Sequence, residues 1–270
     1  MEFNCGKFEW VRYSGVPEQS PIYQYQSPSS SCIEQKQNLR DLGVRLSSDL
    51  SFSLHIEKVV TTASQMVGWG LRTFRNRRSH LLLTMFKALV QPHLDYCCQL
   101  WCPADQGSIN KIEGVQRSLL SRIREARLEK VSYWDKLRIL KLYSQERRRE
   151  RYLVIFIWKI SQGLVEGYHL SFTTPDSRTG RKAVPYHINR SASTCVRNAR
   201  ERSLAVKGVQ LFNLLPVQLR NSEHGDVEMF KNHLDTYLSN IPDQPTIEGL
   251  VRPAQTNSLI YQIPLYENMN

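Results

Sequence analysis

The stretch from residue 39 to residue 101 constrains the fold more than any other, because the spacing of its apolar residues changes within it. In its first part, hydrophobic side chains nearly alternate with polar ones, which is typical of a short strand: Leu39, Leu42, Val44 and Leu46. After Ser47 the apolar residues recur every three or four positions, which predicts a helix over residues 54–71 with one apolar face. The sequence therefore predicts a strand that leads directly into a helical region.

Local signals predict where these helices begin and end. Asp49 is the predicted N-cap of the first helix, and Gly68 and Gly70 are predicted to end it. Ser79 is the predicted N-cap of the next helix. Pro92 lacks an amide proton and clashes with the preceding turn, so it predicts an interruption or a kink in that helix.

The charge of the chain favours a polyanionic partner. The 270 residues carry a formal net charge of +11, and 41 % of them are hydrophobic, which is enough to form a core. Between residues 117 and 151 there are twelve Lys or Arg against five Asp or Glu, interleaved with apolar residues at helical spacing. This pattern favours a groove that follows a phosphate backbone. Solvated helix faces and a basic helix on a membrane surface are the alternatives.

The arginines and lysines of three basic segments are the candidate nucleic-acid contacts. These segments lie between the first two predicted helices, in the helices over residues 109–160, and in the region after residue 177. The candidates are Arg72, Arg75, Arg77, Arg78, Arg117, Arg122, Arg124, Arg147, Arg148, Arg151, Arg181 and Lys182.

The N-terminus has no apolar segment typical of a signal peptide, and no apolar run approaches the roughly 18 residues of a membrane span. We therefore expect an intracellular protein, nuclear or cytoplasmic, that is not secreted and has neither a membrane nor a small molecule as its partner. Six cysteines in such a chain are expected to be free thiols. His93, Cys97, Cys98 and Cys102 fall within ten residues, but two adjacent cysteines cannot easily face one metal from a helix. Buried apolar thiols are the favoured interpretation over zinc ligands.

Several strings of this sequence resemble, in wording and order, the reverse transcriptases of non-LTR retrotransposons of the jockey and chicken-repeat type. The strings are LGVRLSSDLSFSLHI, LLLTMFKALVQPHLDYCCQLW, QRSLLSRI, WDKLRIL, QERRRERY, FNLLP and FKNHLDTYL. The resemblance implies that the strand at residues 42–46 is similar to the primer grip, and that the following helices are similar to the polymerase thumb. It covers almost the whole chain and implies RNA, DNA or an RNA:DNA hybrid as the partner.

The same resemblance implies that catalytic groups of the polymerase are missing. In this family two magnesium ions, about 4 Å apart, are held by an aspartate-bearing strand and a Tyr-x-Asp-Asp turn that precede a lysine motif. Lys7 matches that auxiliary lysine, but the chain contains no Asp-Asp pair. We therefore expect a truncated, catalytically inactive fragment without a cofactor of its own, since Mg²⁺ would belong to the intact parent enzyme. A helical interaction protein or a non-functional relic without a nucleic-acid role is the alternative.

The expected fold is mainly α, with a small N-terminal β-hairpin, a helical thumb-like bundle and a small mixed α/β C-terminal region in which residues 183–188 and 204–206 form short strands. The expected parts are a palm remnant with the grip-like strand at 1–47, the thumb and its basic helical extension at 48–162, a linker at 163–176, a basic C-terminal domain at 177–240, and an extended or disordered tail at 241–270.

Overall fold

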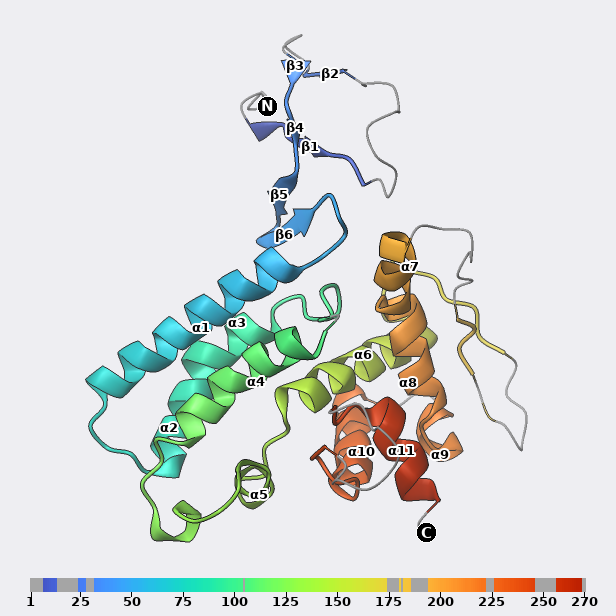
Figure 1. The fold of residues 1–270 in the computed structure, drawn as a ribbon. Coiled ribbons are helices and arrows are strands. Elements are labelled where there is room, and N and C mark those ends of the chain that lie inside the picture. Colours follow the sequence, from blue (N-terminus) through green and yellow to red (C-terminus); the bar gives the residue numbers. More distant parts are fainter. Residues whose placement is uncertain are drawn as a thin grey trace.

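The computed structural model describes residues 7–13, 24–27, 32–103, 105–173, 180, 182–185, 194–221, 226–245 and 256–268. Its fold is mainly helical with a few short strands, which confirms the predicted class. Figure 1 shows the strands at the N-terminal end, one group of helices below them, and a second group formed by the C-terminal part of the chain.

The N-terminal strands are short and pair only two by two. β1 (Trp10–Val11) runs parallel to β4 (Gln35–Lys36), and β2 (Tyr25–Gln26) pairs antiparallel with β3 (Cys32–Ile33).

The region predicted as one strand is a hairpin of β5 (Asn38–Asp41) and β6 (Val44–Ser47). Leu42 and Gly43 form its turn with φ values of 44° and 91°. Positive φ at both residues is what a two-residue turn between twisted strands requires.

The first helix, α1 (Ser53–Thr73), extends past both glycines that were predicted to end it. Gly70 has a packing reason to be glycine, because a β-carbon there would overlap the side chain of Met85. Asp49 is not the N-cap, since Phe52 holds that position and the Asp49 carboxylate accepts a hydrogen bond from the amide of Ser51 at 2.9 Å.

The second helical run consists of α2 (Ser79–Met85), the π-helical turn η2 (Phe86–Val90) and α3 (Gln91–Asp95). The widened turn comes directly before Pro92, where the missing amide would otherwise leave a gap in the α-helical ladder. Ser79 is the first helical residue and not the cap: its amide donates to the Glu125 carboxylate at 2.5 Å.

Three helices follow, and a side chain caps each of them as the sequence chemistry demands. They are α4 (Gln106–Leu120), α5 (Tyr133–Ile139) and α6 (Gln145–Ser161), with the short 3₁₀ turn η3 (Ala126–Leu128) after α4. Asp105, Ser132 and Ser144 accept the capping hydrogen bonds. α1 packs on α3 and α4 around a core that includes Phe86, Leu94 and Trp101.

The C-terminal region is mainly helical in its described part. Its elements are α7 (Thr194–Glu201), the π-helical η4 (Leu204–Gly208), α8 (Val209–Asn213), α9 (Val217–Arg220), α10 (Val227–Ser239) and α11 (Leu259–Glu267). The strand expected at residues 204–206 is therefore wrong, because that segment forms η4. In the described residues of this region, β pairing is limited to the bridge between Phe172 and Ala183.

The predicted extended tail is wrong for residues 259–267, which form the helix α11 with a buried side. Residues 246–255 of that tail lie outside the described residues. Two carboxylates of α6 hold the segment that leads into it. Glu146 accepts from the hydroxyl of Thr256 and the amide of Asn257, and Glu150 accepts from the hydroxyl of Ser258 and the amide of Leu259, each of the last two at 2.6 Å. Thr256, Asn257 and Ser258 are thus buried hydrogen-bond partners.

α6 belongs to both groups of helices. Its first half contacts α4, and its second half forms the C-terminal core with α8, α10 and α11. In that core the rings of Trp158 and Phe230 stack at a centroid distance of 4.4 Å. The expected linker at residues 163–176 therefore follows a helix whose second half is part of the C-terminal core. None of the helices in the described part of the chain is long and apolar enough to cross a membrane.

Candidate nucleic-acid interface

Arg147, a candidate nucleic-acid contact, is inside the protein. Its side chain is 0 % exposed, and its guanidinium donates to the backbone carbonyls of Ile241 and Pro242 at 2.5 and 2.7 Å. Asp243 lies 3.5 Å from its Nε. A buried guanidinium that is already bonded to the chain cannot reach a phosphate, so Arg147 is removed from the interface.

Arg148 and Arg151 form ion pairs within the fold. Arg148 binds Asp95 through two nitrogens, with the shorter contact at 2.8 Å, and Arg151 binds Asp235 in the same two-point manner. The first pair fastens α6 to α3 and the second fastens it to α10. Both predicted contacts are therefore corrected to structural cross-links, because their donors are directed at carboxylates of the protein itself.

Arg149 of the same run is buried, although it was not a candidate. It donates to the carbonyls of Leu94 and Trp101 at 3.0 and 2.6 Å, and its guanidinium lies 3.7 Å from the centre of the Trp101 ring. Burial lowers the pKa of this guanidinium. The arginine-rich start of α6 thus ties α3, the turn after it and the C-terminal segment together.

A second group of candidates lies on two segments that meet at the end of α1 farthest from the hairpin, one after α1 and one after α4 (Figure 1). We call it the tip cluster. It consists of Arg72, Arg75, Arg78, Arg122 and Arg124. All five are exposed, and within the described ranges none of them forms a salt bridge.

The backbone explains why this cluster assembles. The amide of Arg124 donates to the carbonyl of Arg77 at 3.0 Å, which joins the loop after α4 to the loop after α1. Glu125 adds to this contact by capping Ser79, and these hydrogen bonds hold the pKa of Glu125 down at about 2. Arg77 itself is half-buried and donates to the carbonyl of Leu71, so it fixes the loop after α1 to the end of that helix.

The remaining candidates are scattered. Arg117 is exposed and stacks on Tyr133 at 4.7 Å from the ring centre. Lys7 lies exposed ahead of β1, and Lys182 is exposed beside the bridge at Ala183. Arg181 lies outside the described residues.

A basic groove that the sequence did not indicate lies at the other end of α1. Its volume is about 610 Å³. It is lined by Arg40, Leu42, Gly43, Arg45, His55, Lys58, Val59, Thr62, Pro92, His93 and Tyr96. The hairpin forms one wall, α1 the floor and α3 with the following turn the other wall. Tyr96 closes the groove by donating from its hydroxyl to the carbonyl of Leu42 at 2.6 Å.

A polar stripe on α1 connects the groove with the tip cluster. Lys58 lines the groove, and Thr61, Gln65 and Gly68 line a shallow furrow that reaches Arg72. These positions are three or four residues apart, so they lie on one side of the helix. At 1.5 Å per residue, Lys58 and Arg72 are about 21 Å apart along the axis. Trp69, next to the stripe, is 48 % exposed.

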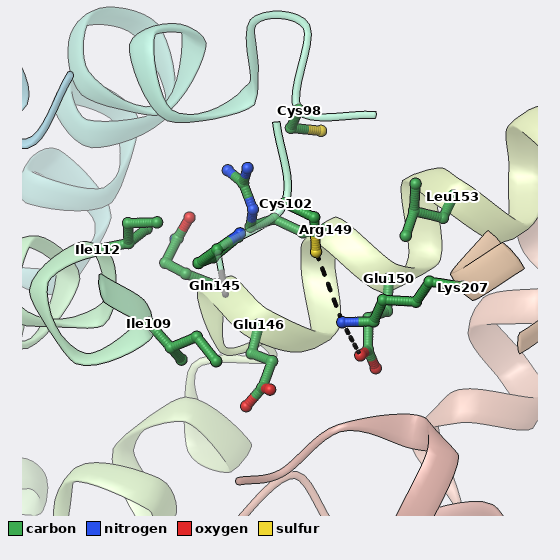
Figure 2. Close-up of a pocket in the computed structure, with 11 residues that line it drawn as sticks. Cys98, Cys102, Ile109, Ile112, Gln145, Glu146, Arg149, Glu150, Leu153 and Lys207 are labelled. Carbon is green, nitrogen blue, oxygen red and sulfur yellow. Dashed lines mark hydrogen bonds and ion pairs between the residues drawn. The ribbon is translucent and has the colours of Figure 1, made fainter. Parts of the chain in front are cut away.

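Of the three cysteines predicted as buried thiols, Cys98 and Cys102 are buried and Cys97 is half-buried. Cys98 and Cys102 line a small cavity of about 20 Å³, which has room for about one water molecule. Figure 2 shows Lys207 between Cys102 and Glu150, with its ammonium 2.9 Å from the Glu150 carboxylate. Burial raises the pKa of the Cys98 thiol to about 11. All five described cysteines are free thiols, and among the described residues no three His, Cys, Asp or Glu side chains are grouped to hold a metal.

No protein-family model, curated protein or solved structure matches this chain.

Proposed function

We propose that this chain binds a nucleic-acid duplex, most naturally an RNA:DNA hybrid, as the grip and thumb region of a non-LTR retrotransposon reverse transcriptase. The observation that carries the proposal is the exposed side of α1, where cations stand at both ends and uncharged polar residues lie between them. The resemblance of the sequence to that family supports the same role for the hairpin and for α1.

The charges at the two ends match what a phosphate backbone needs. Arg40, Arg45 and Lys58 surround the groove, and the tip cluster offers further guanidiniums about 21 Å away along the helix. The middle of the stripe can lie along the wide, shallow minor groove of an A-form duplex. Thr61 and Gln65 can hydrogen-bond to its sugars and base edges, and Gly68 allows close approach.

In this proposal the chain contributes binding and no chemistry of its own. The magnesium ions of the parent polymerase belong to its palm, and a nucleic-acid partner places the protein in the nucleus or the cytoplasm.

A salt series of fluorescence anisotropy titrations with a short labelled RNA:DNA hybrid tests the proposal. If six cations contact phosphates, a plot of log affinity against log salt concentration has a slope of about −5. Binding that is absent at low salt, or that does not respond to salt, contradicts the proposal.

The second candidate, a helical interaction protein without a nucleic-acid role, is favoured by the apolar side chains near the groove. Leu42, Tyr96 and Leu100 are all more than half exposed, with Leu42 at 84 %. Such a surface suits a protein partner. A flat salt series would favour this candidate.

A further inference from the structure

One imidazole holds the hairpin wall of the groove against its floor. The backbone amide of Arg45, in β6, donates to Nδ1 of His55, in α1, at 3.3 Å. His55 is 4 % exposed and lines the groove, and its ring meets the edge of Trp101 at a centroid distance of 4.9 Å. This hydrogen bond therefore joins the two elements that carry Arg45 and Lys58.

The contact requires a neutral imidazole. Nδ1 can accept a hydrogen bond only while it carries no proton, because a protonated ring has a donor at both nitrogens. After protonation, the N–H of the ring would face the N–H of Arg45.

The surroundings of His55 also disfavour a positive charge on its imidazole ring. Burial lowers the pKa of His55 below its ordinary value, and the guanidiniums of Arg149, in α6, and of Arg45 lower it further. The groove adds more basic side chains around this ring: Arg40 from β5, Lys58 from α1 and His93 from α3. No carboxylate is among the described residues that line the groove, so none of them compensates a positive charge on this ring.

We propose that His55 is a positioning residue of the groove, and that its protonation releases β6 from α1 and weakens nucleic-acid binding on acidification. The inference rests on the proposed function and adds a regulation to it. Its sign is distinctive, because a protein that merely gains positive charge in acid binds a polyanion more tightly.

The test compares the wild type with His55→Asn and His93→Asn in anisotropy titrations of a labelled RNA:DNA hybrid at constant salt, between about pH 7.5 and about pH 5.5. Asparagine keeps an acceptor near the place of Nδ1 but does not titrate. His93 is the matched control, since it is a second imidazole that lines the same groove. We expect the affinity of the wild type and of His93→Asn to fall as the pH is lowered, and that of His55→Asn to stay constant or rise, because only the first two proteins keep an imidazole at position 55.

The inference is overturned if the wild-type affinity is constant or rises on acidification, or if His55→Asn loses affinity to the same extent. Hydrogen exchange of residues 38–47 in the wild type, normalised to the intrinsic rate at each pH, gives an independent readout. Selective loss of protection at low pH supports the released hairpin, and unchanged protection refutes it. If no hybrid binds at any pH, the proposed function fails, while the exchange experiment still decides the role of His55.

Discussion

Two arginine-rich segments of this chain can be compared directly: residues 72–78, from the last turn of α1 to the residue before α2, and residues 147–151, near the start of α6. Each contains four arginines. In the first segment three are exposed and unpaired with any described carboxylate, whereas in the second all four bind carbonyls or carboxylates of the protein. The local density of arginine therefore does not indicate whether the charges serve a partner or the fold.

The position of each segment explains the difference. Residues 72–78 lie at the end of α1 and in the loop after it, where guanidiniums keep their hydration. α6 lies between two groups of helices, so Arg147 and Arg149 are buried and Arg148 and Arg151 are partly buried, and all four bond to acceptors in the protein. Those acceptors are helix-end carbonyls and single aspartates such as Asp95 and Asp235.

Replacement of Arg147 by methionine is the strongest way to test this comparison. It removes the partner of two buried carbonyls and of Asp243, so we expect a loss of about 3–5 kcal/mol in the free energy of unfolding. Urea denaturation followed by circular dichroism measures it. Arg78→Met in the tip cluster is the matched control, and its change should stay within about 0.5 kcal/mol. Equal effects of the two substitutions would contradict the distinction between structural arginines in α6 and exposed arginines in the tip cluster.

A buried carboxyl group of α4, Glu113, which contacts the start of α6, should make the stability of the fold depend on pH. Glu113 accepts from the amide of Gln145 and from the Tyr133 hydroxyl, and burial raises its pKa to about 7. A carboxyl whose folded pKa lies above its unfolded value of 4.5 costs stability as the pH rises from that value, until it is fully ionised above about 7.

We therefore expect the wild type to lose about 3 kcal/mol between pH 5 and pH 8 from this group. Glu113→Gln has no titrating proton, so it should lose clearly less over the same range. Urea midpoints at the two pH values measure the difference. A parallel decline in both proteins would assign the pH dependence to other groups.

Arg148 and Arg151 sharpen the comparison within α6. Each makes a two-point ion pair, but Arg148 holds Asp95 at the end of α3, beside the groove, and Arg151 holds Asp235 in α10. Arg148→Gln and Arg151→Gln should each cost about 2 kcal/mol in the free energy of unfolding. Only Arg148→Gln should weaken binding of the RNA:DNA hybrid. The proposed placement of the groove is contradicted if Arg151→Gln weakens binding equally.

The exposed cations should produce the smallest change in stability. Lys58→Gln combined with Arg72→Gln is expected to reduce the slope of log affinity against log salt by about two, one for each phosphate contact. Unfolding should change by less than about 0.5 kcal/mol, since both side chains are exposed. A salt slope identical to that of the wild type would remove the stripe on α1 from the interface.

Much of the helical fold follows from local pattern. The apolar spacing predicts α1, and Pro92 predicts the interruption that the structure shows as η2. Arg72, Arg75 and Arg78 were predicted as candidates from their segment alone, whereas their meeting with Arg122 and Arg124 depends on the distant hydrogen bond from the amide of Arg124 to the carbonyl of Arg77.

The errors come from distant partners. The carbonyl acceptors of Arg147 lie 94 and 95 residues further along the chain, so no local pattern reveals them. The groove was missed because residues 39–46 were read as one strand. With the turn at Leu42 and Gly43, Arg40 and Arg45 come to line the groove beside α1. The helix α11 was missed because it contains Pro264 and follows a polar segment. Its start is held by hydrogen bonds to the distant carboxylates of Glu146 and Glu150.

Because α6 packs against both groups of helices, the protein cannot be divided after this helix without exposing part of its core. A fragment that stops at residue 162 would keep the hairpin and the helical bundle, yet it would expose Trp158, Ile157 and Leu153 to water. Such a fragment should aggregate unless another apolar surface covers that side of α6, so the C-terminal helices shield the N-terminal half from aggregation.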